Sequence, residues 1–569
     1  MITSTRRWRI VAAAAFALLM PATATPAHAA PGDETSTLAK ALKLQAQLYK
    51  TKQIGTTALD EGDVGGLPIA AGGDMSCSAG AQEVFCWGGG DTEPVAAGSP
   101  RLVSGPIAAG RAHLCALEYP EDSDGGDLYC WGDNTYGQVG DGTTTARTAP
   151  VKVHDDVLQV VTGADHTCAV LTDQTPLCWG RDDAGQVGQG AAGPPVLTPQ
   201  PVAGLTDLID VAAGGDSTCV IEESGAAKCW GSNSDGQIGD GTAGVTPVAT
   251  PTAVDTSAIG AGTDLMQIEV GGRHACAVTE DLGVWCWGAD DHGQLGDGAP
   301  LSGQNLPVDT GVEDVYAVSA GGDSSCAVDE DGHAWCWGDN TEGQLGTGDT
   351  TDQPEPAKVD QSGVATSGLY EDALDASGGL LFAISMGERH ACAMDVSGNP
   401  YCWGDNADGQ LGDGTTTDRL EPTATLLLPG TADDVVAQAR DAEIGVDWSE
   451  PDELGAGSPM GYRVVALADS GYALCYSDDS TDTACTLTNL TNNAEYRIFV
   501  TTMASGGAAT AASVRATPRG MATPAPDDDG KNDIAVGLPI TGAAISLLLV
   551  IGAVMVLGGV LLRRKARDR

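Results

Sequence analysis

Residues 271–298 contain the unit from which most of this chain is built. The sequence reads GGRHACAV at 271–278, VWCWG at 284–288 and GQLGDG at 293–298. Two short apolar runs flank a turn, and this pattern predicts a β-hairpin. Cys276 and Cys286 are symmetric about the turn, so antiparallel pairing sets them opposite each other. Their Cα atoms are then expected within the roughly 4.4–6.8 Å that a disulfide allows.

The same hairpin recurs along the chain. Cys-Trp-Gly occurs seven times, each time with another cysteine a short way upstream, and its tryptophans are Trp87, Trp131, Trp179, Trp230, Trp287, Trp337 and Trp403. The repeat length drifts from 44 to 66 residues, while the spacing inside the hairpin stays nearly constant. This combination predicts an array of similar hairpins joined by variable loops.

A glycine motif follows six of the seven hairpins. Gly-Gln-x-Gly, with Val, Ile or Leu in the gap, occupies residues 137–140, 185–188, 236–239, 293–296, 343–346 and 409–412. The glycines permit positive φ in a tight turn, and the apolar residue can enter the core beside it. The first unit has GGGD at 88–91 instead. Terminal repeats are often atypical in this way.

All 16 cysteines fall into local pairs. The pairs are Cys77 and Cys86, Cys115 and Cys130, Cys168 and Cys178, Cys219 and Cys229, Cys276 and Cys286, Cys326 and Cys336, Cys392 and Cys402, and Cys475 and Cys485. Even pairing at near-constant spacing predicts a disulfide framework and an oxidising compartment. Metal binding is the alternative, but zinc ligands usually pair at two-to-four-residue gaps and no CxxC occurs here.

Composition supports an all-β array. The 569 residues include 78 glycines and only 4 phenylalanines, which suits short strands joined by tight turns. The formal net charge of −50 argues against nucleic acid as a partner, because phosphates would be repelled. We interpret the acidity as a soluble, self-repelling surface.

The N-terminus is predicted to be a secretory signal over residues 1–29. Arginines at 6, 7 and 9 precede an apolar run, and an Ala-His-Ala cleavage site ends at Ala29. Residues 30–63 form a separate segment, with apolar residues at helical spacing over 37–50.

The C-terminus, residues 538–569, has three consecutive parts. A pentapeptide comes first, then 20 apolar residues at 543–562, then a basic tail. The apolar run is long enough to span a bilayer, and the tail should stay cytoplasmic. A permanent transmembrane anchor is therefore one interpretation. The order of the parts resembles the LPXTG cell-wall sorting signal of Gram-positive surface proteins, and the pentapeptide is Leu538, Pro539, Ile540, Thr541 and Gly542.

That resemblance implies processing by a sortase. The enzyme would cleave between Thr541 and Gly542 and join Thr541 to peptidoglycan. The span at 543–562 would hold the chain in the membrane only until then. The expected location is extracellular, at the cell wall.

Residues 64–428 resemble the regulator of chromosome condensation repeat family. The resemblance rests on the glycine-rich strand, the alternating strand, Trp-Gly-x-Asn and Gly-Gln-Leu-Gly, as at 337–340 and 343–346. It implies a seven-bladed β-propeller. Later units carry a Pro-x-x-Val segment such as 150–153 before the glycine strand, and the first unit has none. We therefore expect residues 422–428 to return and complete the first blade.

Residues 429–518 show a different pattern of alternating strands around Trp448, which predicts a β-sandwich. This part resembles a fibronectin type III domain, in which Cys475 and Cys485 would join the strands of one hairpin. Residues 519–537 are rich in Pro, Asp and Gly and are typical of a linker. The expected fold class is thus all-β: a propeller, a sandwich and a C-terminal transmembrane sorting helix.

Three sets of residues invite a chemical interpretation. His113, His166, His274 and His390 share one repeat position, where hydrogen bonding between blades is favoured over metal binding. The Gly-Asp-Gly-Thr loops at 140–143 and 412–415 are interpreted as turns and not calcium sites. The runs around Trp-Cys-Trp resemble the Asp-box of sialidases, but arginines are few and scattered.

The functional expectation is a non-enzymatic surface protein without cofactor or metal. It would bind a protein or glycan through propeller loops, because a rigid frame that presents many loops suits recognition. Two alternatives stay open: guanine nucleotide exchange, the activity of nuclear family members, and a cell-wall glycan-active enzyme. Export argues against the first, and the absence of common catalytic motifs argues against the second.

Overall fold

The computed structural model describes residues 69–519. It leaves out 80–83, 98–105, 120–122, 124, 261–262, 300, 365–378, 396–398, 428–431, 452–458, 469–470, 478–482, 505–506 and 511–513. The predicted signal, the 30–63 segment and the sorting signal therefore lie outside the described residues. Within the described part the only helical element is the 3-10 turn η1 (Thr256–Ala258). None of the helices described there has the length and apolar character needed to cross a bilayer.

Residues 69–424 form six antiparallel sheets whose strands follow one another in chain order. The first sheet contains β1 (Ile69–Ala71), β2 (Met75–Ala79), β3 (Val84–Gly88) and β4 (Asp91–Ala96). The second has seven strands: β5 (Ile107–Ala109), β6 (His113–Glu118), β7 (Gly126–Gly132), β8 (Arg147–Thr162), β9 (His166–Leu171), β10 (Pro176–Gly180) and β11 (Val196–Pro201).

The other four sheets have four strands each. They are β12 (Leu208–Gly214), β13 (Ser217–Glu222), β14 (Ala227–Gly231) and β15 (Val248–Ala253); β16 (Leu265–Val270), β17 (His274–Thr279), β18 (Val284–Gly288) and β19 (Gln304–Asp309); β20 (Val315–Gly321), β21 (Ser324–Asp329), β22 (Ala334–Gly338) and β23 (Gln353–Lys358); β24 (Leu381–Met386), β25 (His390–Asp395), β26 (Pro400–Gly404) and β27 (Arg419–Ala424).

The long strand β8 explains why one sheet has seven strands. Its first part pairs with β7, and its second part, from Val157 onward, pairs with β9. The second sheet thus contains two disulfide hairpins, whereas each of the others in this region contains one. We call each disulfide hairpin with its flanking strands a unit.

Each unit places its proline segment in the outermost strand. Residues 150–153 lie in β8 and pair with β7 of the unit before them, not with the unit that follows. The expectation that residues 422–428 complete the first blade was wrong: β27 pairs with β26, and the first sheet has its own outer strand, β4. Proline lacks an N–H donor, so an outer strand with one free edge accommodates it.

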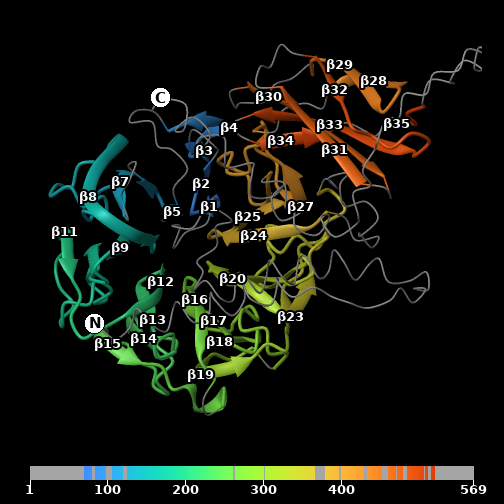
Figure 1. Cartoon of the computed structure of the whole chain (residues 1–569). Coiled ribbons are helices and arrows are strands. Elements are labelled where there is room, and N and C mark those ends of the chain that lie inside the picture. The colour runs from blue at the N-terminus through green and yellow to red at the C-terminus, as the bar shows by residue number, and fades with distance from the viewer. Residues whose placement is uncertain are drawn as a thin grey trace, which may run out of the picture. The chain divides into compact units, whose positions relative to one another are not determined.

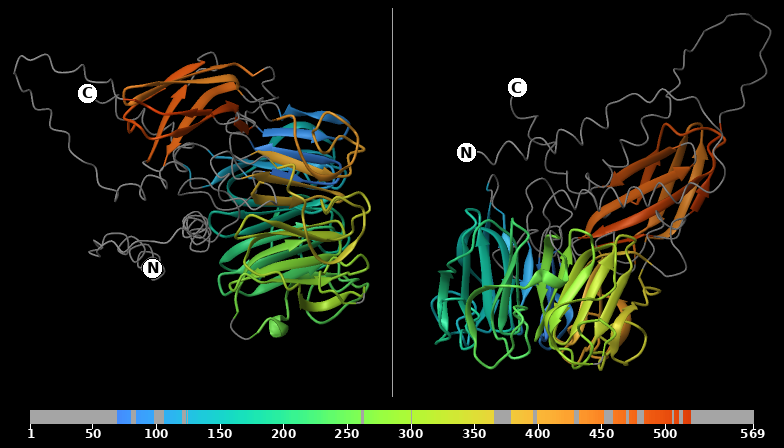
Figure 2. Two further views of the ribbon diagram at one scale, coloured as in Figure 1. Left: turned by 90° about the vertical axis from the view of Figure 1, so that its right-hand side faces the viewer. Right: turned by 90° about the horizontal axis from the view of Figure 1, so that it is seen from below.

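Figure 1 shows the sheets arranged in a ring, and Figure 2 shows the same sheets from two further sides. Contacts between sheets close it. Between the first and last sheets, Ala71 donates its N–H to Ser385 Oγ at 3.0 Å, and Glu388 donates its N–H to the Gly72 carbonyl at 3.0 Å. Similar links join other neighbours, since Met386 donates its N–H to Ser319 Oγ at 3.0 Å. The junction is therefore built like the other contacts in the ring.

The predicted hairpins are present, and their cysteines lie directly opposite one another. Cys276 pairs with Cys286 in the register of β17 and β18, and the turn falls between Thr279 and Val284. In all seven units the disulfide joins Cα atoms 4.1 Å apart, slightly less than the predicted range. So short a separation is typical of non-hydrogen-bonded antiparallel pairs.

The tryptophan and glycine motifs meet at the contacts between units. The indole N–H of Trp403 donates to the Gln344 carbonyl at 2.9 Å, and five other tryptophans make the same bond: Trp87, Trp179, Trp230, Trp287 and Trp337. These six are at most 1% exposed. Trp131, which follows the unit without Gly-Gln-x-Gly, is 7% exposed.

Residues 433–516 form two further sheets around a separate core. One contains β28 (Asp433–Arg440), β29 (Glu443–Ser449) and β32 (Ala484–Leu487); the other contains β31 (Gly471–Ser477), β30 (Pro459–Ala468), β33 (Tyr496–Ala504), β34 (Gly507–Thr510) and β35 (Val514–Ala516). Trp448 from the first sheet and Tyr462 from the second are buried, with ring centroids 5.1 Å apart. Both sheets therefore contribute to one core, as a β-sandwich requires.

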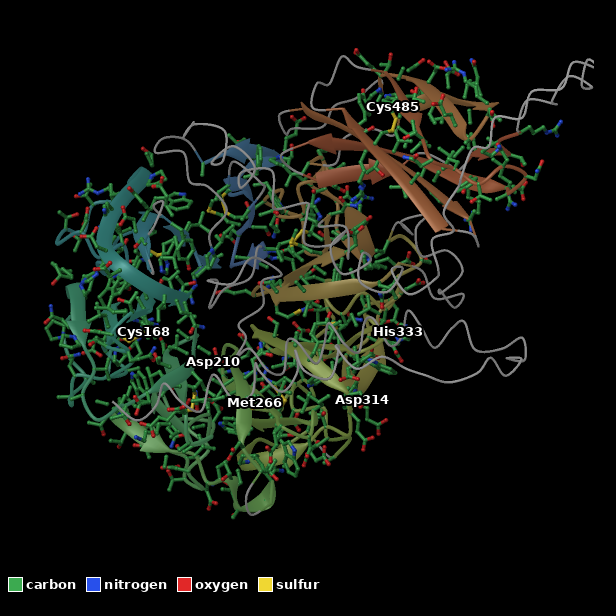
Figure 3. All side chains as sticks on the ribbon, in the orientation of Figure 1. Cys168, Asp210, Met266, Asp314, His333 and Cys485 are labelled. Carbon is green, nitrogen blue, oxygen red and sulfur yellow. A yellow bond between two sulfur atoms is a disulfide. The ribbon has the colours of Figure 1, made fainter. Side chains whose placement is uncertain are left out.

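The eighth disulfide differs from its prediction. Cys475 lies in β31 and Cys485 in β32, so the bond joins the two sheets and not the strands of one hairpin (Figure 3). Its Cα atoms are 6.5 Å apart. A spacing of ten residues is compatible with a bond inside a hairpin and with a bond between two sheets, because a chain of that length can also cross from one sheet to the other.

Candidate functional site

A cavity of about 650 Å³ lies at the centre of the ring. The first strand of each of the seven units, which we call its inner strand, lines this cavity. Its wall consists of β1, β5, β8, β12, β16, β20 and β24, and many lining residues are Ala, Val or Gly. Each inner strand ends in glycine or in a turn that begins with glycine. Bulky side chains are thus absent from much of the described wall, which leaves the centre open.

Charged residues gather at one end of this cavity. In every unit the inner strand and the Cys-Trp-Gly strand run in the same direction, so the turns that follow them lie at the same end of the ring. We call this end the channel mouth, and its charged lining residues are Arg111, Asp216, Arg273, His292, Asp323, Asp339, Glu388 and Arg389. Basic and acidic groups are interspersed there.

Ion pairs join charged residues of this end both within and between units. Arg111 Nε lies 3.0 Å from Glu388, and its Nη1 lies 3.5 Å from Asp165. Arg273 Nη2 lies 2.8 Å from Asp291 and 3.2 Å from Asp323. The side chains of Arg111, Arg273 and Arg389 are 50%, 39% and 63% exposed, so these pairs add little stability but leave the charges available to a partner.

One sector of this end is acidic. Burial raises the pKa of Asp74, and the nearby carboxylates of Asp408, Glu388 and Asp405 raise it further, while Arg111 opposes them. The junction between the first and last sheets therefore concentrates negative charge beside the arginines.

Two acidic residues lie deeper, in the cavity wall. Asp210 Oδ2 accepts the N–H of Ile268 at 2.8 Å, and its Oδ1 accepts Gln159 Nε2 at 3.1 Å. Burial raises the pKa of Asp210 to about 6, and burial together with the Asp210 charge raises the pKa of Glu269 to about 8. Both Asp210 oxygens are occupied by links between β8, β12 and β16, which gives this carboxyl a structural role.

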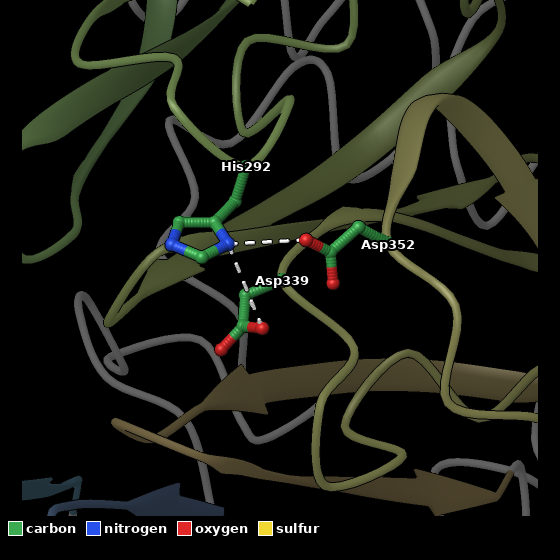
Figure 4. Close-up of side chains that lie close together, drawn as sticks. All are labelled: His292, Asp339 and Asp352. Atoms are coloured by element: carbon green, nitrogen blue, oxygen red, sulfur yellow. Dashed lines mark hydrogen bonds and ion pairs between the residues drawn. The ribbon is translucent and has the colours of Figure 1, made fainter.

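A cluster at the edge of the mouth has the donor atoms that a metal ion uses. His292 follows β18, Asp339 follows β22 and Asp352 precedes β23, so the contact between two units brings the three together (Figure 4). Their ligand atoms all lie within 4.8 Å of one another. This cluster was not predicted from the sequence. The only signal was that the residue before the first glycine of Gly-Gln-x-Gly, five positions after six of the seven repeat tryptophans, varies from unit to unit: Tyr136, Ala184, Asp235, His292, Glu342 and Asp408.

The four repeat histidines form hydrogen bonds between units, as predicted. His274 Nε2 lies 2.7 Å from Ser325 Oγ, and His166 Nε2 lies 2.9 Å from Thr218 Oγ1. His113 pairs with Thr167 at 3.0 Å and His390 with Ser76 at 2.7 Å in the same way. All four side chains are fully buried and separated around the ring, so the structure does not bring them together.

The Gly-Asp-Gly-Thr loops are turns, as expected. Asp413 Oδ1 accepts the N–H and the hydroxyl of Thr415 at 3.0 and 2.7 Å, and its Oδ2 pairs with Arg419. Asp141 has the same arrangement with Thr143 and Arg147. In each loop an arginine therefore already pairs with the carboxylate that a metal ion would need. The pentapeptide from Leu538 to Gly542 lies outside the described residues.

This ring of four-stranded units around a charged cavity defines a β-propeller with a candidate recognition face. The chain belongs to the RCC1-like domain family, which matches residues 47–382, and RCC1 repeats match residues 383–410 and 397–439.

Curated relatives include the ultraviolet-B receptor UVR8 of Arabidopsis thaliana, which is 31% identical over 56% of this chain and 68% of its own length. The mitochondrial RCC1 domain-containing protein RUG3 of the same plant is 28% identical over 40% of this chain and 54% of its own length. The human E3 ubiquitin-protein ligase HERC2 is 29% identical over 41% of this chain, but the match spans only 5% of that protein.

Solved structures share the fold. Human WBSCR16 has a TM-score of 0.52 at 21% identity, covering 61% of this chain and 86% of its own. Yeast RCC1 (Prp20), solved with Kap60, has a TM-score of 0.51 at 19% identity, covering 66% of this chain and 89% of its own.

Proposed function

We propose that this chain is a non-enzymatic surface protein of a Gram-positive bacterium. A secretory signal at 1–29 exports it, and a sortase joins Thr541 to peptidoglycan. The channel mouth then binds a protein or glycan outside the cell. Among relatives, HERC2 is named as a ligase, but this chain matches only 5% of it, so the match supports no transfer of that activity.

The architecture that we propose is a seven-bladed propeller followed by a fibronectin type III-like sandwich. Seven disulfide hairpins support the blade count, with β8 serving as the outer strand of one blade and the inner strand of the next. In the sandwich, buried Trp448 and the bond from the Thr491 N–H to the Tyr496 hydroxyl at 3.0 Å support the second assignment. A tyrosine at a strand start that bonds to upstream backbone is common in such sandwiches.

The cysteines support an oxidising compartment. All eight pairs are disulfide-bonded and none is free, and such frameworks persist in oxidising surroundings. A guanine nucleotide exchange factor needs a GTPase inside the cell, so an exported propeller is separated from it. The disulfides therefore favour recognition at the cell surface.

The observation that carries the binding proposal is the channel mouth. Its exposed arginines alternate with carboxylates on turns held by a rigid ring. Such a surface favours a partner with complementary charges, and charges of this kind mainly set association rate and specificity.

Wall anchoring is tested in a sortase-bearing Gram-positive host that expresses the full chain. Wild type should appear in the peptidoglycan fraction and be released by a muralytic enzyme, whereas Thr541→Ala should stay in the membrane fraction. Equal wall attachment of both chains would contradict the sorting signal.

Binding is tested on the same cells with a panel of glycans and secreted proteins. A partner that binds wild type should bind the double variant Arg111→Glu and Arg389→Glu more weakly, and added salt should weaken its binding to wild type. Arg515→Glu, an exposed arginine of the sandwich, is the matched control. A hit that responds equally to the control would contradict the channel mouth as the binding face.

A further inference from the structure

His292, Asp339 and Asp352 face one another across the contact between two units. His292 Nδ1 lies 3.1 Å from Asp352 Oδ2 and 3.8 Å from Asp339 Oδ1 (Figure 4). The exposed fraction of the side chain is 35% for His292, 38% for Asp352 and 16% for Asp339. The cluster is thus held by protein on one side and accessible to solvent on the other.

Each carboxylate is fixed by contacts that leave an oxygen directed at the histidine. Asp352 Oδ1 accepts the N–H of Asn340 at 2.9 Å, which leaves Oδ2 facing His292. Asp339 Oδ2 accepts Gln344 Nε2 at 2.8 Å, and Oδ1, which also accepts the N–H of Thr341 at 3.1 Å, faces His292. Hydrogen bonds that orient ligands in this way are typical support for metal sites.

No cationic side chain of the described residues neutralises these two carboxylates. Asp141 and Asp413 each pair with an arginine, but Asp339 and Asp352 form ion pairs only with His292 within that part of the chain. The nearby Arg273 pairs instead with Asp235, Asp291 and Asp323. The two carboxylates thus remain available to a cation.

We propose that His292, Asp339 and Asp352 form a zinc-binding site at the edge of the channel mouth. Zinc takes one imidazole nitrogen and two carboxylate oxygens at about 2.0–2.2 Å, and a tetrahedral ion separates such ligands by roughly 3.3 Å. The distances from His292 are 3.1 and 3.8 Å, and the two carboxylate oxygens lie within 4.8 Å of each other, so side-chain shifts of up to about 1.5 Å bring all three to one ion. Calcium takes about six to eight oxygen ligands, which this cluster does not supply.

The fourth position would be open to water or to a group of a bound partner. The site stands independently of the proposed surface function, because a metal can bind here whatever the partner is. All 16 cysteines are in disulfides, so thiolates do not compete for the metal.

The next unit supplies a matched control. There Glu342 stands at the His292 position, and Asp405 and Asp418 correspond to Asp339 and Asp352. Asn406 donates its N–H to Asp418 Oδ1 at 2.9 Å, as Asn340 does to Asp352. Glu342, however, lies 3.7 Å from Arg389, and no histidine is present in that triad. The scaffold is the same, but the nitrogen ligand is missing.

The test is calorimetric titration of ZnCl₂ into the full chain, purified in detergent and stripped with a chelator. Wild type and Asp418→Asn should each bind one zinc ion with similar affinity. His292→Ala and Asp352→Asn should weaken this binding by at least about tenfold, because the loss of even a hydrogen-bond partner of a ligand costs about ten- to hundredfold in metal affinity. Thermal unfolding without metal checks that each variant is folded, and zinc should raise the midpoint only where the site is intact.

Cobalt gives a second readout. CoCl₂ should produce a visible absorption spectrum of a four- or five-coordinate ion in wild type and Asp418→Asn, and not in His292→Ala. Zinc affinity or a cobalt spectrum unchanged by His292→Ala would overturn the proposal. Equal affinity for CaCl₂ and ZnCl₂ would overturn it as well, because it would assign the cluster to hard cations.

Discussion

Four histidines are buried at the contacts between neighbouring units, and they make stability depend on pH. Burial lowers the pKa of His113 and His390 to about 4, and that of His166 and His274 to about 3. In an unfolded chain a histidine binds its proton near pH 6.5. Below that pH the unfolded state binds more protons than the native state. The contribution of these four histidines to the free energy of unfolding therefore falls as the pH falls from about 6.5 toward 4, while Asp210 and Glu269, whose pKa values are raised, contribute in the opposite direction.

Replacing one of these histidines should flatten that pH dependence. Between about pH 6 and 4.5, the free energy of unfolding should depend less steeply on pH in His166→Gln than in wild type. The slope should decrease by the equivalent of one proton, about 1.4 kcal/mol per pH unit. Urea unfolding at several pH values measures it. Thr218→Val removes the hydroxyl that lies 2.9 Å from His166 Nε2, so it should lower stability while keeping the slope. Equal slopes in wild type and His166→Gln would contradict the assignment.

At the scale of the element, the final glycine of Gly-Gln-x-Gly fits against the tryptophan of the next unit. Gly346 has φ of +68°, and a Cβ there would lie 2.8 Å from Trp403 Nε1. We expect Gly346→Ala to destabilise by roughly 2–4 kcal/mol, since left-handed backbone and overpacking both contribute. Gly348 also has positive φ, but the atom nearest to a Cβ added there would be an oxygen of the flexible Glu421 side chain at 3.4 Å. Its cost should be clearly smaller in urea unfolding, and equal costs would contradict the packing argument.

The disulfides should differ in their reactivity because they differ in exposure. Cys475 and Cys485 are half-buried, whereas both cysteines of six propeller pairs are at most 1% exposed. Under native conditions with a mild reductant and an alkylating agent, we expect Cys475 and Cys485 to be labelled before those twelve cysteines. Peptide mass spectrometry measures the order. Simultaneous labelling of all pairs would show that the propeller hairpins open as readily as the sandwich.

The sequence predicted those parts of the fold that depend on local spacing. Cys276, Cys286 and the turn between them lie within one hairpin, so the repeat alone placed them. The outer strands were assigned to the wrong unit, because a proline segment such as 150–153 lies between two units in the sequence. Only sheet pairing decides that it belongs to β7. Cys475 and Cys485 were placed in one hairpin for a similar reason, since spacing does not distinguish a hairpin from a crossing between sheets.

At the scale of the whole molecule, the sites arise from contacts between units, and no local pattern contains them. His292 and Asp352 are 60 residues apart, and they meet only because neighbouring sheets pack side by side. The arginines of the channel mouth likewise looked scattered in the sequence. Their repeat positions bring them to one end of the ring, where Arg111 of the second sheet reaches past the first sheet to Glu388 of the last sheet.

Closure of the ring gives the last prediction. Ser76 Oγ lies 2.7 Å from His390 Nε2 and donates to the Gln410 carbonyl at 2.9 Å, across the junction of the first and last sheets. Ser325 makes the same pair of contacts inside the ring, at 2.7 Å to His274 and 3.1 Å to the Gln294 carbonyl. Both serines are fully buried.

If the junction is as tightly closed as the internal contacts, Ser76→Ala and Ser325→Ala should destabilise equally, by about 1–3 kcal/mol for the partners left unpaired. In an open arc the terminal sheets could separate, and Ser76→Ala would then cost much less than Ser325→Ala. Urea unfolding of both variants, followed by tryptophan fluorescence, distinguishes the two cases. The fluorescence is informative because Trp87 also crosses the junction, donating to the Gln410 carbonyl at 2.8 Å.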